Sequence, residues 1–132
     1  MYKTLKVNDS LIFDSSFNTC NLKALALLIH EDLEFYHDKS GVLKGKNNFI
    51  ENTKNGLCKS PNKLRRELLE ETLEVFPLNE NDGKLYGAIQ KGTHRFYQDD
   101  KRTGIAYFTH LWIIENDKWL LKRVLSYDHK TE

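Results

Sequence analysis

The stretch Tyr107-Phe-Thr-His-Leu-Trp-Ile-Ile-Glu-Asn-Asp-Lys-Trp-Leu-Leu-Lys-Arg-Val-Leu-Ser-Tyr-Asp-His129 decides the fold. Two runs rich in Trp, Ile, Leu, Val, Phe and Tyr flank the polar segment Glu115–Lys118, which is the pattern of an antiparallel hairpin. Neither run alternates cleanly between apolar and polar residues, so we expect both faces of each strand to be covered. The hairpin is therefore predicted to be central in a sheet, with one face on the core and the other on a partner subunit.

The sheet is expected to extend upstream of this hairpin. Apolar runs separated by polar turns predict strands over Lys84–Gln98, Thr103–Asn116 and Lys118–Asp128. The segment Leu64–Leu78 is open to two interpretations, because Leu-Arg-Arg-Glu-Leu-Leu-Glu-Glu is also compatible with a helix. The Val-Phe-Pro and Asn-Asp-Gly sequences that follow it favour a strand.

The first half of the chain reads as three helices and a short hairpin. Helical spacing of apolar residues predicts helices over Thr4–Phe17 and Leu22–Ile29, and a third over Lys46–Gly56 that a glycine can end. A short strand over Leu33–Asp38 turns through Lys39-Ser-Gly toward Val42–Leu43. This order predicts one α+β domain over residues 1–132, with about six strands and the helices gathered on one face.

Composition excludes several classes of protein. The 132 residues carry a net charge of +1, with 39% hydrophobic and 30% charged residues, so nothing favours binding to nucleic acid or to an anionic membrane. No apolar run is long enough to cross a bilayer, and the N-terminus lacks the apolar core of a signal peptide. A cytoplasmic protein is expected, although a signal peptide removed before residue 1 would leave no trace. Cys20 and Cys58 are accordingly expected to be buried free thiols, not a disulfide.

A resemblance to a known superfamily follows from the motifs at both ends of the predicted sheet. Asp32-Leu-Glu-Phe-Tyr-His-Asp38, with a turn glycine and a short helix after it, and the ending Trp119-Leu-Leu-Lys-Arg-Val-Leu-Ser-Tyr-Asp-His129 resemble the nuclear transport factor 2-like superfamily. Within it they are similar to bacterial domains of unknown function near the polyketide-cyclase-like and ketosteroid-isomerase-like branches. The resemblance implies a cone-shaped curved antiparallel sheet, with helices closing a pocket on its concave face and a homodimer contact on its convex face.

The ketosteroid-isomerase-like branch suggests one specific activity. Asp38 matches the general base of those enzymes, which add a Tyr and a protonated Asp as donors to the oxyanion. By approximate spacing, these donor positions fall at Phe13 and Thr109 here, and loss of each preorganised donor costs about 10²–10³ in rate. The resemblance therefore supplies a base without its partners, and steroid isomerisation is not expected.

Four histidines, His37, His94, His110 and His129, lie on or at the end of predicted strands. They are open to three interpretations: half-buried structural side chains, polar or acid–base groups of a pocket, or metal ligands. No short metal-binding spacing such as His-x-x-x-His occurs, so we predict no metal and no cofactor. Ser126-Tyr-Asp-His129 is sequence adjacency, which does not by itself make a catalytic triad.

Strand parity selects candidate pocket residues. Lys91 and Arg95 share one face of their strand, which sends Gln90 and His94 to the other. On the last strand Arg123, Tyr127 and His129 share a face with Trp119 and Leu121. The predicted ligand pocket consists of Tyr36, His37, Asp38, Gln90, His94, His110, Arg123 and Tyr127, with Asp38 and His94 as catalytic candidates.

Two function classes remain open, with a third behind them. The first is a pocket protein for a hydrophobic small molecule with a polar or acidic end. The second is an enzyme of the proton-transfer, dehydration or hydrolysis type that uses Asp38 with a pocket histidine. The third is an interaction domain with a vestigial pocket. In each case we expect a homodimer through the convex face, in which Trp112 or Trp119 is the outward aromatic of the last hairpin.

Overall fold

The computed structural model describes all 132 residues. Three α-helices lie in the first half of the chain: α1 (Tyr2–Phe13), α2 (Leu22–Ala26) and α3 (Lys46–Asn55). Short turns of other helix types follow α1 (η1, Asp14–Asn18), follow α3 (η2, Leu57–Lys59) and separate two strands (η3, Glu70–Thr72). The strands are β1 (Ile29–His37), β2 (Gly41–Lys44), β3 (Leu64–Leu68), β4 (Glu74–Asn79), β5 (Leu85–Gln98), β6 (Lys101–Glu115) and β7 (Lys118–Thr131).

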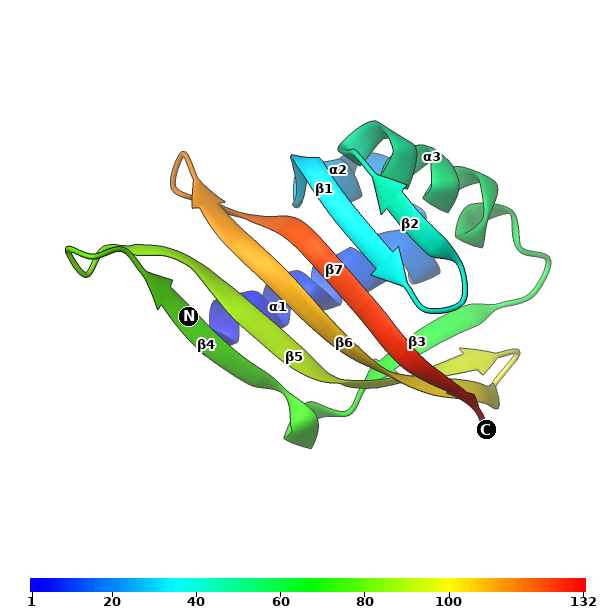
Figure 1. Ribbon diagram of the computed structural model, residues 1–132. Helices are drawn as coiled ribbons and strands as arrows, with labels where there is room; N and C mark the ends of the chain where they lie inside the picture. The colour runs from blue at the N-terminus through cyan, green and yellow to red at the C-terminus, as the bar shows by residue number, and fades with distance from the viewer.

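The strands form one curved sheet, and the helices cover its concave side (Figure 1). The strand order is β2-β1-β7-β6-β5-β3, with β4 also paired to β5, and only the β1–β7 pair is parallel. Figure 1 shows α1 crossing the sheet behind β5, β6 and β7, while α3 lies beside β1 and β2. The α+β cone predicted from the sequence is therefore confirmed.

The core lies between α1, α2 and the sheet. Leu5 and Ile12 of α1 and Leu25 of α2 pack with Trp112 of β6 and Leu121 of β7. All of these side chains are buried, so their removal from water is the main stabilising contribution of the helical layer. Trp112 is completely buried, and the expectation that it faces a partner subunit is wrong.

The uncertain segment Leu64–Leu78 forms two strands separated by a helical turn. β3 pairs with the far half of β5, from Leu64 opposite Gln98, and β4 pairs with the near half, from Glu74 opposite Lys91. Between these two pairings the chain leaves the sheet at η3 and then returns to β5. The hydroxyl of Thr72 stabilises this turn, because it donates to the carbonyl of Leu69 and accepts the backbone N–H of Thr93.

The predicted closing hairpin is present, but its two faces differ. Phe108 of β6 and Val124 of β7 are buried on the concave face, whereas Tyr107, Leu125 and Tyr127 are exposed on the convex face. The expectation that both faces are covered is therefore not met within one chain. The turn residues at positions 116 and 117 have positive φ angles of 53° and 62°, which Asn and Asp tolerate better than most residues.

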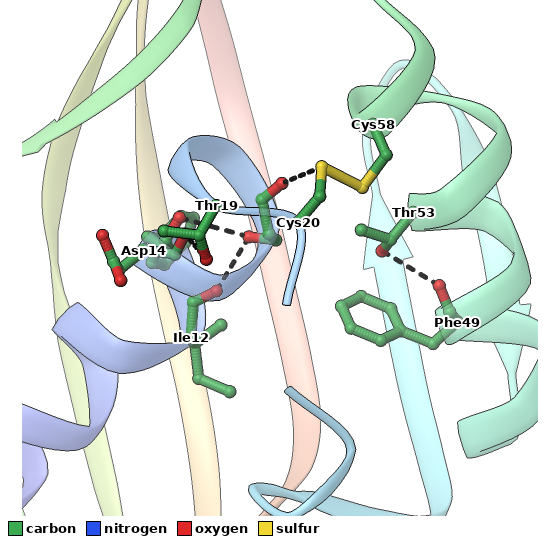
Figure 2. The surroundings of a disulfide bond; sticks show 9 residues. Ile12, Asp14, Thr19, Cys20, Phe49, Thr53 and Cys58 are labelled. Atoms are coloured by element: carbon green, nitrogen blue, oxygen red, sulfur yellow. Dashed lines mark hydrogen bonds between the residues drawn. A yellow bond between two sulfur atoms is a disulfide. The ribbon is translucent and has the colours of Figure 1, made fainter. Parts of the chain in front are cut away.

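Cys20 and Cys58 form a disulfide, so the expectation of two free thiols is wrong. The bond connects the loop after η1 to η2, with a Cα–Cα distance of 5.6 Å, and Figure 2 shows it beside Thr53 and Phe49 of α3. This pairing could not be predicted from the sequence, because the two cysteines are 38 residues apart and come together only in the folded chain. Disulfides persist mainly in oxidising compartments, so the cysteines no longer support a cytoplasmic location. None of the helices is both long and apolar enough to cross a membrane.

Candidate functional site

A cavity of about 370 Å³ lies between the helices and the concave face of the sheet. Six of the seven phenylalanines of the chain line it: Phe13, Phe17, Phe35, Phe49, Phe96 and Phe108. No Lys, Arg, Asp or Glu side chain belongs to the lining, and its polar groups are histidines, serines, Asn52 and Thr53. The cavity therefore combines an aromatic wall with a few uncharged hydrogen-bonding groups, as small-molecule sites usually do.

The structure brings three of the predicted pocket residues to the cavity: His37, His94 and His110. His129, which the sequence analysis weighed but did not include in the pocket, lines the cavity as well. Asp38 lies directly behind His129. All four strand histidines thus converge on one cavity.

Tyr36, Arg123 and Tyr127 lie on the other face of the sheet, and their predicted place in the pocket is wrong. Arg123 donates to the carboxylate of Glu34 at 2.6 Å, and the Tyr36 hydroxyl donates to the same carboxylate. The hydroxyls of Tyr127 and Thr109 form a hydrogen bond of 3.1 Å. For the two β7 residues, Arg123 and Tyr127, an irregularity in the β6–β7 pairing between Leu111 and Trp112 is responsible, because it places one extra residue in β7 and reverses the alternation of its side chains.

Gln90 also lies outside the cavity lining, beneath α1. Its amide nitrogen donates to the carbonyl of Leu5 at 3.0 Å, and its amide oxygen accepts the indole N–H of Trp112 at 2.9 Å. The same oxygen is 3.3 Å from Nδ1 of His110. Since this oxygen can only accept, Nδ1 of His110 must carry the proton. The neutral ring of His110 therefore keeps a free lone pair on Nε2, and Gln90 acts as a positioning residue.

His94 has the opposite tautomer. Nε of Arg66 can only donate, and it donates to Nδ1 of His94 at 3.0 Å. The proton of the neutral imidazole is then on Nε2, which is buried and has no hydrogen-bond partner. Since buried polar atoms are normally paired, this N–H is an unsatisfied donor in the folded chain.

Arg66 is held in place by Asp9 of α1. The guanidinium forms two hydrogen bonds with the Asp9 carboxylate, and it packs 3.7 Å from the ring centre of Phe13. Burial raises the pKa of Asp9, while the charge of Arg66 opposes the rise. Neither Asp9 nor Arg66 was predicted from the sequence as a site residue. A signal for Asp9 exists, since this lone acid shares a helical face with Leu5 and Ile12, and a carboxylate on an apolar face needs a buried cation.

His94 and His110, which we call the floor of the cavity, are both neutral at pH 7. Burial, followed by the charge of Arg66 and the two histidines nearby, lowers the pKa of His94 to about 2. Burial and Arg66 lower the pKa of His110 to about 3. At pH 7 the floor of the cavity thus presents one N–H donor on His94 and one lone pair on His110, and no net charge.

A second group of polar side chains lies at the mouth of the cavity. Nδ1 of His129 contacts Oδ1 of Asp38, and the backbone N–H of His129 donates to Oδ2 at 3.1 Å. Burial of Asp38 opposes its ionisation, but these two hydrogen bonds more than offset that effect and hold the pKa of Asp38 below its ordinary value. Nε2 of His129 lies 3.3 Å from Oγ of Ser126. The ring of His37 stacks on that of His129, with 4.3 Å between the ring centres.

His37, Asp38 and His129 are close enough together to contact one cation. The tautomer of His37 opposes this use, because its Nδ1 accepts the backbone N–H groups of Lys39 and Ser40 at 3.0 and 3.1 Å. The proton of the neutral ring is then on Nε2, so neither nitrogen offers a free lone pair. The mouth is consequently better suited to proton transfer than to metal binding.

Comparison with known proteins shows similarity in structure only. No protein-family model matches the chain, and no curated protein sequence does so either. A nuclear transport factor 2-like protein of unknown function from Pseudomonas putida superposes with a TM-score of 0.78 at 11% identity, over 95% of this chain and 84% of that one. A family member from Streptomyces avermitilis to which a dehydratase activity has been ascribed gives 0.76 at 10% identity, over 95% and 93%.

A third similar structure is an enzyme with a named substrate. The hexachlorocyclohexane dehydrochlorinase LinA type 3 from Novosphingobium barchaimii gives a TM-score of 0.74 at 11% identity, over 97% of this chain and 87% of that chain. The chain therefore has the nuclear transport factor 2-like fold, as its motifs predicted. At these identities the likeness establishes the fold, and function has to be argued from the site.

Proposed function

We propose that the protein binds a small, largely apolar and uncharged molecule in the phenylalanine-lined cavity. One observation carries this proposal: His94 lines the cavity, and its Nε2–H is buried and has no partner in the folded chain. A carbonyl, ether or hydroxyl oxygen of the ligand would accept this hydrogen bond, and a ligand hydroxyl could donate to Nε2 of His110. The aromatic wall would contact the rest of the molecule.

The charge of the site supports a neutral ligand over an acidic one. The nearest cation behind the floor, Arg66, is already paired with Asp9 through two hydrogen bonds. A carboxylate bound in the cavity would lose its hydration without gaining a free cation, and burial of an unpaired charge is strongly unfavourable. This narrows the ligand class expected from the sequence, a hydrophobic molecule with a polar or acidic end, to its uncharged members.

A matched pair of probes tests this proposal. Acetonaphthone and naphthoate have the same ring system, but only the second is charged. A ligand present at 100 times its dissociation constant adds about 2.7 kcal/mol to the free energy of unfolding, so we expect acetonaphthone to raise the melting temperature and naphthoate to have little effect. His94→Phe should abolish the shift, whereas Tyr86→Phe, outside the cavity, should preserve it. Equal stabilisation by both probes, or full binding by His94→Phe, would contradict the proposal.

A second candidate function is general-base catalysis at the mouth of the cavity. It is favoured by the pairing of Asp38 with His129, because a carboxylate that accepts Nδ1–H leaves the lone pair on Nε2 and stabilises the imidazolium that forms. Two structurally similar proteins are named for elimination reactions, a dehydratase and a dehydrochlorinase. An elimination that begins with loss of a proton needs a base of this kind.

Hydrogen exchange tests the base directly. The methyl protons of acetonaphthone are weakly acidic, and their replacement by deuterium in heavy water can be followed by NMR. We expect the wild-type protein to accelerate the exchange and His129→Gln to remove the acceleration while acetonaphthone still binds. An unchanged exchange rate in His129→Gln would exclude this residue as the base.

A further inference from the structure

We propose that Ser126, His129 and Asp38 form a nucleophilic triad that transfers acyl groups from uncharged apolar esters. This inference rests on the proposed binding of neutral apolar molecules in the adjoining cavity. It identifies the Ser126 hydroxyl as the source of the first proton that His129 accepts, and it assigns a covalent role to a serine that the binding function does not require.

The hydrogen-bond order is the one that an activated serine needs. Asp38 can only accept, so the proton of the neutral His129 ring lies on Nδ1, and the lone pair on Nε2 faces Oγ of Ser126 at 3.3 Å. The backbone N–H of His129 donates to the second oxygen of Asp38 at 3.1 Å and fixes that carboxylate. Nucleophile, base and orienting acid therefore lie in one hydrogen-bonded chain, which defines a triad by geometry whatever the order of its residues in the sequence.

This juxtaposition depends on an irregularity in β7. In a regular strand, residues three apart point to opposite faces, so Ser126 and His129 could not both reach the cavity. Between the pairs Tyr107–Tyr127 and Ile105–Lys130, β7 contains one residue more than β6. Asp128, at this point, has a φ of 56°. A bulge that redirects a side chain, with a non-glycine residue in the left-handed region, is a feature that sheets often carry next to active sites.

Ser126, His129 and His37 all line the cavity. Ser126 is opposite His37 in the parallel β1–β7 pairing. Because Nδ1 of His37 accepts two backbone N–H groups, Nε2 of its neutral ring carries a proton. This N–H is the group at the mouth that is available to stabilise the negative oxygen of a tetrahedral intermediate.

The two parts of the ester would bind in two adjoining hollows of the protein. The apolar acyl group would occupy the main cavity. An open, polar groove outside it shares His37, Phe96 and His129 with the cavity and is otherwise lined by Lys39, Thr103, Gly104, Lys130 and Thr131. This groove would receive the alcohol portion, so the leaving alcohol can depart to solvent without crossing the cavity.

The reaction would proceed in two balanced steps. Oγ of Ser126 attacks the carbonyl carbon while Nε2 of His129 takes the hydroxyl proton, and that proton passes to the departing alkoxide as the C–O bond breaks. Water then attacks the acyl-enzyme, with His129 again accepting a proton, which it returns to Oγ of Ser126 as the acid leaves. The net change is ester plus water to acid plus alcohol. Ser126 and His129 would be catalytic residues, and Asp38 a positioning residue.

An alkyl fluorophosphonate and a nitrophenyl butyrate substrate test the triad. We expect the fluorophosphonate to add to wild-type protein, with peptide mass spectrometry locating the adduct on Ser126. Ser126→Ala and His129→Gln should lower ester hydrolysis by about 10²-fold or more. Ser10→Ala is the control, since Ser10 is an exposed residue of α1 outside the cavity, and it should react normally. Asp38→Asn should lower kcat with KM unchanged and should alter the pH profile of hydrolysis.

The outcomes separate this inference from the binding proposal. If wild-type protein binds acetonaphthone but forms no Ser126 adduct, the triad is wrong and the binding function stands. If the adduct forms without ketone binding, the binding proposal fails and the triad stands. Equal hydrolysis by wild type and Ser126→Ala would overturn the triad, and Ser126→Gly, with circular dichroism on both variants, shows whether a loss of activity reflects misfolding.

Discussion

The guanidinium of Arg66 on β3 donates two hydrogen bonds, of 2.7 and 3.2 Å, to the carboxylate of Asp9 on α1, although these side chains are only 3% and 0% exposed. The pair joins the N-terminal helix to a strand at the edge of the sheet. A third N–H of Arg66, on Nε, donates to Nδ1 of His94 and so fixes the tautomer of that histidine. The ion pair next to the apolar cavity thus holds the guanidinium that donates to Nδ1 of His94.

Removal of one partner of this pair should destabilise the protein strongly. Asp9→Ala leaves the Arg66 charge buried and uncompensated, which costs about 3–5 kcal/mol. Glu34→Gln is the matched control, because it breaks the exposed pair with Arg123, and such pairs contribute about 0–1 kcal/mol. Urea unfolding measures both changes. Similar losses for the two variants would show that Asp9 and Arg66 are not an essential buried pair.

Stability should fall between pH 7 and pH 5. His94 and His110 have folded pKa values of about 2 and about 3, below the value of roughly 6.5 in an unfolded chain. The unfolded state therefore binds more protons below pH 6.5, and the stability that these groups contribute at neutral pH is lost as the pH falls. At pH 5 the loss is about 2 kcal/mol for each histidine.

The pH dependence is checked by urea unfolding of wild type and of the double variant His94→Gln, His110→Gln. The slope of stability against pH should be smaller in the double variant. The raised pKa of Asp9 has the opposite effect on the pH dependence of stability. Because Asp9 is present in both proteins, its effect does not change the comparison. Identical slopes for the two proteins would mean that the histidines are not held neutral by the fold.

The disulfide should stabilise the protein by restricting the unfolded chain. For a loop closed across 38 residues, the chain-entropy relation gives about 4 kcal/mol. Cys20→Ser with Cys58→Ser should show this loss in urea, and wild type should match it after reduction. A reducing agent should have no effect on the double variant, which is the control. Equal stability of oxidised and reduced wild type would contradict the expectation.

The convex face is expected to form a homodimer. Tyr107, Leu125 and Tyr127 are exposed on it as large side chains, and the two tyrosine rings lie 5.9 Å apart. Leu125→Glu should place a charge in the contact and give a monomeric mass by light scattering. Val7→Glu alters an exposed residue of α1 and should leave the mass unchanged. A monomeric wild-type protein, or a dimer in Leu125→Glu, would disprove this interface.

Most of the elements could be predicted from local sequence. The closing hairpin, α1 and α3 follow from the spacing of apolar residues and from turns of Asn, Asp and Gly, which act over a few neighbouring residues. The ambiguity at Leu64–Leu78 was also real, since η3 divides this segment into two strands. Where local preferences agree with the fold, the sequence is a sufficient guide.

The residues of the candidate site were harder to predict from local sequence than the helices and strands. Strand parity identified His94, but it also selected Gln90, which lies outside the cavity lining. The same reasoning placed Arg123 and Tyr127 on the wrong face, because an extra residue in β7 is visible only in its pairing with β6. Ser126 and His129 come together through the second such irregularity.

By itself, the sequence thus determined the order of helices and strands, the fold that they build and the presence of histidines at its centre. Only the tertiary structure decided which side chains share the cavity, which nitrogen of each histidine carries the proton, and that Cys20 and Cys58 pair. The physical reason is that periodicity and turn chemistry are local, whereas register, bulges, buried ion pairs and disulfides depend on residues far apart in the chain. A shift of one residue in register turns a side chain from the core to solvent.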